Sequence, residues 1–187
     1  MTNSPFIILT SLLLFFSGCK KDEPLDPVIP NEEELITTFK YTLTPIGGGE
    51  NIILTFKDLD GDGGNPPTIS KGKLDTNTTY SGSVELLNEL ENPVGNITEE
   101  VREESNDHQL FYQSTISELE VSYNDNDLNN NPIGLVTQVK TKAAGSGNIT
   151  ITLRHKPNKS GNGVQSGDIT NAGGETDIVV TFELDVQ

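Results

Sequence analysis

Alternation of apolar and polar residues with a period of two constrains the fold of this chain more than any other feature. It is clearest near the C-terminal end, where apolar residues occupy every second position: Ile178, Val180, Phe182, Leu184 and Val186. Successive side chains of a strand point to opposite faces, so this pattern predicts a strand with one face in a core.

The same pattern predicts about eight strands and one short helix. The expected strands cover residues 35–44, 51–57, 78–88, 108–113, 117–124, 133–141, 149–154 and 178–186, and the helix covers 97–104. Clusters of Gly, Asn, Asp or Pro separate most of these runs, as is typical of turns. We therefore predict an all-β fold, an antiparallel β-sandwich that is Ig-like or related.

The N-terminal region predicts export and lipid attachment. Residues 6–16 are almost wholly apolar, which suits a signal peptide but is too short for a membrane-spanning helix. The following Phe16-Ser17-Gly18-Cys19 resembles a lipobox, although Phe16 stands where Leu is usual and no Lys or Arg precedes the run. Cys19 is the only cysteine, and a lipid on its thiol would explain why it has no partner. The alternatives are a secreted protein with a free thiol, or a buried N-terminal segment.

These features divide the chain into a signal peptide (1–18), a lipid-anchored linker (19–34) and a β-sandwich domain (35–187). The linker is rich in proline and acidic residues, which favour an extended tether. It opens with Lys20-Lys21-Asp22-Glu23, which resembles the surface-export signal of Bacteroidota lipoproteins. We therefore expect an outer-membrane protein at the cell surface rather than at the periplasmic face; the alternative is an ordinary solvated linker.

The net charge of −16 limits the partners of the chain. Repulsion from phosphates argues against nucleic acid and against anionic lipid headgroups. The charge is compatible with cation binding. The sequence holds no nucleophile elbow, P-loop or dinucleotide fingerprint, so we expect a protein that is not an enzyme.

An acidic loop follows the second predicted strand. Asp58, Asp60 and Asp62, with Gly63 after them, match the opening of an EF-hand loop. The match ends there, because position 12 is Ile69 and two prolines block an exiting helix. The segment could still be a Ca²⁺ loop between strands, and Ca²⁺ is the one cofactor that it suggests. The alternative is an acidic β-turn.

A second, weaker calcium candidate contains Asp125 and Asp127, in a run of Asn and Asp after another predicted strand. Such residues offer oxygen ligands, but they also dominate ordinary hairpin loops. Two such loops in one acidic sandwich favour the calcium interpretation modestly.

The two histidines, His108 and His155, each lie at the end of a predicted strand, in register with its apolar face. Imidazole suits Zn²⁺ or Cu²⁺, and Glu103, Glu104 and Asp107 are close to His108 in sequence. Nothing in the local spacing makes the two histidines meet. We therefore expect them to lie apart, satisfied by hydrogen bonds, and a transition-metal site is the alternative.

Several segments together resemble a family of small Bacteroidota lipoproteins that often carry the label "type 1 periplasmic binding fold superfamily protein". They are LTFKDLDGDGGNPP, TYSGSVELLNE, ITEEVREESNDHQLFYQ, GSGNITITLRHKPNK and GGETDIVVTFE, and the likeness covers residues 12–187. The label implies alternating βα units, which this sequence does not offer. The family has no established activity.

With that resemblance, we expect a lipid-anchored, non-catalytic binding or accessory module. Its partners would be the membrane, through the lipid, and an outer-membrane transporter or another envelope protein. The alternatives are a metal-handling lipoprotein that assists such a transporter and a purely structural surface protein.

Overall fold

The computed structural model describes residues 34–61 and 63–187. The predicted signal peptide, the lipidation of Cys19, the linker up to residue 33 and Asp62 lie outside these residues. The fold below is that of the compact unit Glu33–Gln187.

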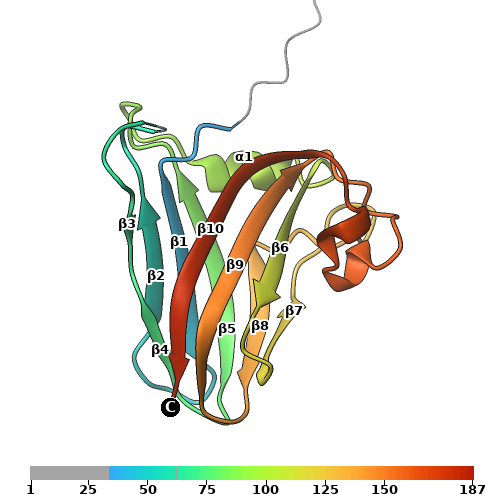
Figure 1. The fold of residues 1–187 in the computed structure, drawn as a ribbon. Coiled ribbons are helices and arrows are strands. Elements are labelled where there is room, and N and C mark those ends of the chain that lie inside the picture. Colours follow the sequence, from blue (N-terminus) through green and yellow to red (C-terminus); the bar gives the residue numbers. More distant parts are fainter. Residues whose placement is uncertain (1–33, 62) are drawn as a thin grey trace, which may run out of the picture. The chain divides into compact units, whose positions relative to one another are not determined.

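The described residues form an all-β sandwich, which confirms the predicted fold class (Figure 1). One sheet has the strand order β3-β2-β1-β5-β8-β7 and the other has the order β4-β10-β9-β6. The first sheet contains β1 (Thr38–Pro45), β2 (Ile52–Lys57), β3 (Thr68–Ile69), β5 (Thr79–Leu87), β7 (Leu119–Tyr123) and β8 (Val136–Thr141). The second contains β4 (Gly72–Leu74), β6 (His108–Ser114), β9 (Gly145–His155) and β10 (Glu175–Val186).

The core lies between the two sheets, where the apolar faces predicted from the alternation meet. Phe39 of β1 and Phe182 of β10 are fully buried, and their ring centroids are 6.2 Å apart. Tyr41 and Ile151, also fully buried, belong to the same continuous cluster. Burial of these faces is the main favourable contribution to folding.

One strand pair departs from the predicted antiparallel arrangement. β4 pairs with β10 in parallel, with Gly72 opposite Leu184. A Cβ atom at Gly72 would lie 2.6 Å from side-chain atoms of both Leu184 and Leu54, so glycine permits this close approach. The strands β3 and β4 have only two and three residues, too few to produce an alternation.

Helix α1 (Ile97–Glu103) lies across the end of the sandwich at which β9 ends and β6 and β10 begin (Figure 1). Its inner face buries Ile97, Thr98 and Val101. The hydroxyl of Thr98 accepts from the backbone N–H of Leu86 and donates to its carbonyl, which holds the helix against β5. The helix therefore places its C-terminal end beside the first residue of β6.

The long connection between β9 and β10 covers the outer face of β6. It contains two short 3₁₀ helices, η1 (Val164–Ser166) and η2 (Ile169–Asn171). Val164 and Ala172 pack on Phe111 in a small second core, and the three are fully buried. Gln109, on the same face, donates to the carbonyl of Val164 at 3.0 Å. Both faces of β6 are therefore buried, which the alternation alone did not indicate.

Candidate metal site

The structure brings the two histidines together. Strands β6 and β9 are antiparallel neighbours, and His108 and His155 are direct cross-strand partners. Their rings are stacked, with centroids 4.6 Å apart and planes inclined by 27°. Directly opposite residues of an antiparallel pair project from the same face, which accounts for the contact. The expectation that the histidines lie apart is wrong, because their strands are neighbours with both ends on one edge of the sandwich.

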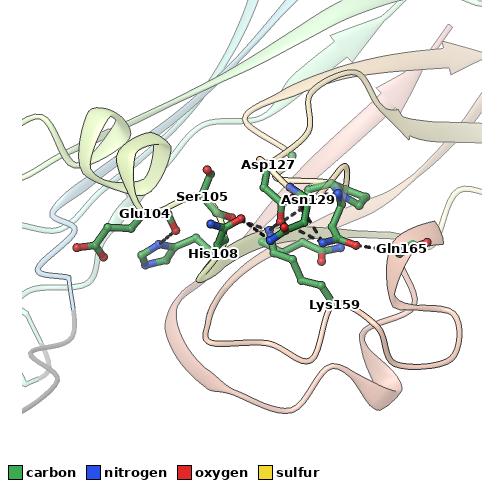
Figure 2. Close-up of polar contacts among 12 residues, drawn as sticks. Glu104, Ser105, His108, Asp127, Asn129, Lys159 and Gln165 are labelled. Carbon is green, nitrogen blue, oxygen red and sulfur yellow. Dashed lines mark hydrogen bonds and ion pairs between the residues drawn. The ribbon is translucent and has the colours of Figure 1, made fainter.

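The end of helix α1 orients His108. Glu104 caps the helix, and its backbone carbonyl lies 3.2 Å from Nδ1 of His108 (Figure 2). The last carbonyls of a helix have no donor within the helix, so a side chain can satisfy them. A carbonyl oxygen only accepts, so Nδ1 carries the proton of the neutral ring and Nε2 keeps its lone pair.

Glu104, His108 and His155 form a cluster with the composition of a metal site, called here the histidine cluster. Each offers one ligand atom, and the three atoms lie within 4.8 Å of one another. An ion at about 2.0 to 2.2 Å from each atom needs them roughly 3 to 4 Å apart, so a small side-chain rotation would suffice. Glu104 is exposed and able to rotate, whereas both histidines are buried. Glu103 and Asp107, also named from the sequence, are not in this group.

The electrostatics of the cluster favour a neutral ligand at His108. Burial lowers the pKa of His108, and it outweighs the opposing effect of the hydrogen bond with the carbonyl of Glu104. A neutral imidazole is the form that binds a metal ion. The Nε2 atom of His108 is buried and has no hydrogen-bond partner in the part of the chain that the structure describes.

Acidic groups surround the cluster. Burial, and then the charge of Glu100, raises the pKa of Glu34 to about 7, and Glu104 and Asp177 contribute in the same direction. The carboxylates thus repel one another at this end of the sandwich. A bound cation would relieve that repulsion.

Asp177 approaches the cluster from β10. Its Oδ2 atom lies 3.9 Å from Nε2 of His108, and neither side chain has any exposed surface. The pairing of β10 with β9 shifts register between Thr176 and Ile178, as in a β-bulge. Ile178 faces the core, so regular alternation predicts that the side chain of residue 177 points away from it. The sequence pattern therefore did not predict that Asp177 is buried.

The carboxylates of Asp125 and Asp127 accept hydrogen bonds from groups of the protein itself. Asp125 accepts the N–H groups of Gly134 and Val136, each at 2.8 Å. Asp127 lies 3.0 Å from the buried ammonium group of Lys159 (Figure 2). A cation of the polypeptide thus already neutralises Asp127, and this favours the structural interpretation of the loop over a calcium site.

The acidic loop after β2 has a similar internal hydrogen-bond pattern. Asp58 accepts from the N–H groups of Asp60 and Gly61, and Asp60 accepts from the backbone and the side chain of Asn65. These bonds are the ones that an acidic turn makes. Calcium binding at Asp58, Asp60 and Asp62 stays a prediction.

Comparisons with known proteins assign no function to the chain, so the function is inferred from the geometry of the site. No family model matches the chain, and no curated protein matches it. Among solved structures, the chain is similar to one titled "Crystal structure of the S-layer protein SbsC domains 4 and 5". The identity is 13%, the alignment covers 78% of this chain and 70% of that chain, and the TM-score is 0.31. Within the described residues, no helix has the length and apolar character needed to cross a membrane.

Proposed function

We propose that this chain is a lipid-anchored, non-catalytic protein of the cell envelope whose β-sandwich binds a divalent transition-metal ion at the histidine cluster. The observation that carries the metal-binding part is the cross-strand pairing of His108 and His155, with stacked rings and a carboxylate of Glu104 beside them. Two imidazoles and a carboxylate are ligands that Zn²⁺ accepts. The fixed tautomer of His108 and its lowered pKa supply the lone pair that the ion requires.

A metal-binding role agrees better with this geometry than calcium-stabilised or purely structural roles. Nitrogen ligands discriminate against Ca²⁺ and Mg²⁺, which prefer oxygen. Among the alternatives from the sequence, this geometry supports the metal-handling role. The lipid anchor and the assisted outer-membrane transporter are proposed from the sequence alone.

Calorimetric titration of the full chain in detergent with Zn²⁺ at pH 7.5 tests metal binding. We expect one ion per chain, and we expect His155→Ala to abolish binding. Glu104→Gln should weaken it, whereas the matched control Glu103→Gln, on the same helix end but outside the cluster, should leave it unchanged. Absence of binding to the wild-type chain would refute the proposal.

The anchor is tested separately, because its support is the Ser17-Gly18-Cys19 motif and the charged residues that follow it. Cells labelled with a fatty-acid probe should incorporate it into the wild-type chain and not into Cys19→Ala. Equal incorporation would show that the lipobox interpretation is wrong. Protease treatment of intact cells then distinguishes the surface from the periplasmic face.

A further inference from the structure

We infer that Asp177 is a fourth ligand of the ion, which makes the site a closed two-nitrogen, two-carboxylate site for a zinc-like ion. This inference rests on the metal-binding function proposed above, but it concerns a residue that the three-residue cluster does not include. It also specifies the class of ion and the kind of site, one without an open position for a substrate.

A ring nitrogen of His108 and a carboxylate oxygen of Asp177 face each other in the interior. Nδ1 of His108 donates to the carbonyl of Glu104, so Nε2 presents a lone pair. Across from it, at 3.9 Å, is a carboxylate oxygen of Asp177. Two electron-rich atoms at this distance attract a positive charge between them. An ion that lies about 2.0 to 2.1 Å from both atoms would bridge them at this separation or at a slightly shorter one.

The backbone of β10 places Asp177 beside His108 through an irregularity in strand pairing. The register shift in β10 is opposite the end of β9, where His155 lies. A bulge re-aims a side chain at a cost in regular ladder pairing, and bulges are common next to functional sites. Here the bulge brings a carboxylate to the buried histidine.

The ligand set determines which ions fit. Two imidazole nitrogens and two carboxylate oxygens can enclose Zn²⁺ in the four-coordinate geometry that is typical of closed sites. A closed site leaves no position for an activated water, in agreement with a non-catalytic role. Ca²⁺ needs six or more oxygen ligands, so the four groups cannot satisfy it.

The experiment compares Asp177→Asn with Asp185→Asn, an exposed aspartate of the same strand, in the full chain. Zinc affinity is measured by competition with a chelator, and Co²⁺ replaces Zn²⁺ for visible spectroscopy. We expect Asp177→Asn to weaken zinc binding by about 100-fold or more. Loss of a residue that only hydrogen-bonds to a ligand weakens metal binding by about 10- to 100-fold, so loss of a direct ligand should reach or exceed the upper end of that range. The tetrahedral Co²⁺ bands should weaken in this variant as water enters. Asp185→Asn should match the wild type in both measurements.

If Asp177→Asn fails to fold, the variant Asp177→Cys tests whether residue 177 contacts the ion. A thiolate in contact with Co²⁺ adds a sulfur-to-metal charge-transfer band, which appears only if residue 177 touches the ion. If Asp177→Asn binds zinc as the wild type does, or if Asp177→Cys binds Co²⁺ without that band, Asp177 is not a ligand and the three-residue site still stands. If the wild-type chain binds no ion, the proposed function fails, and the inference fails with it.

Discussion

Two buried polar clusters adjoin the same short segment, residues 104–108, and they differ in how completely the polypeptide satisfies them (Figure 2). In the first, called here the lysine network, the ammonium group of Lys159 donates to the carbonyls of Ser105 and Pro132, at 2.6 and 3.0 Å, and to Asp127. In the histidine cluster, Nε2 of His108 has no hydrogen-bond partner among the described residues.

The difference separates a structural role from a binding role. An ammonium group has three donors, and Lys159 uses each of them on the protein. Burial raises the pKa of Asp127, but the N–H of Asn131 and the ammonium of Lys159 outweigh it and hold that pKa below its usual value. Such a network joins three segments of the chain and leaves no capacity for a ligand. The incomplete histidine cluster does leave that capacity.

The largest effect should come from breaking the lysine network. Lys159→Met leaves the buried carboxylate of Asp127 without its counter-charge, so we expect a loss of about 3 to 5 kcal/mol in the free energy of unfolding. Denaturant unfolding measures this loss. The control Lys142→Met removes an exposed ion pair with Glu120, which solvent screens, and should therefore cost far less. If Lys159→Met lowers the free energy of unfolding no more than the control does, the lysine network does not stabilise the fold.

Zinc should act on the other cluster alone. An ion that binds only the folded state stabilises it by about 2.7 kcal/mol at a free concentration 100 times the dissociation constant. We expect this gain in wild-type chain and in Lys159→Met where it remains folded, but not in His155→Ala. A zinc-dependent gain in His155→Ala would place the ion elsewhere, and thermal unfolding with and without zinc provides the measurement.

The carboxylates around the histidine cluster should give a pH dependence of smaller size. The pKa of Glu34 is raised to about 7 in the folded state, so its contribution to stability is present below pH 4.5 and is lost as the pH rises through 7. Glu34→Gln should therefore improve the metal-free stability relative to the wild type at pH 8 and not at pH 4. The exposed control Glu50→Gln should show no such difference. Parallel stability curves for Glu34→Gln and wild type would contradict the pKa shift.

The smallest effect is expected in the exposed loop after β2. Asp60 accepts hydrogen bonds from Asn65 at the surface, so Asp60→Asn should leave the free energy of unfolding close to that of the wild type. The same variant tests the calcium prediction. A rise in melting temperature in millimolar Ca²⁺ that is present in wild type and lost in Asp60→Asn would establish a calcium loop there.

The sequence predicted most of the fold because alternation reports directly which face of a strand is buried. It located β1, β2, β5 and the helix to within a few residues, and their apolar faces form the core. It failed where burial has another cause. The short strands β3 and β4 carry no periodic signal, and the outer face of β6 is buried by a loop whose position no local pattern specifies.

The site was less predictable, since it depends on which strands are neighbours and in which register. His108 and His155 were both identified as candidates, yet their meeting follows from the β6–β9 pairing, which is a tertiary property. Asp177 was missed because its orientation comes from a register shift. Lys159 was missed as well, because a lone lysine in a loop is usually solvent-exposed. In each case the decisive information lies between segments distant in the sequence.

The position of β10 has a consequence for when the domain can fold. β10 pairs with both β4 and β9, and the N–H of Gln187 donates to the carbonyl of Leu74. Synthesis proceeds from the N terminus, so the second sheet cannot be completed until β10 has been made. Until then the core lacks the buried residues of β10, which are Val180, Phe182, Leu184 and Val186. The sandwich therefore stays incompletely folded while the residues before β10 are being made.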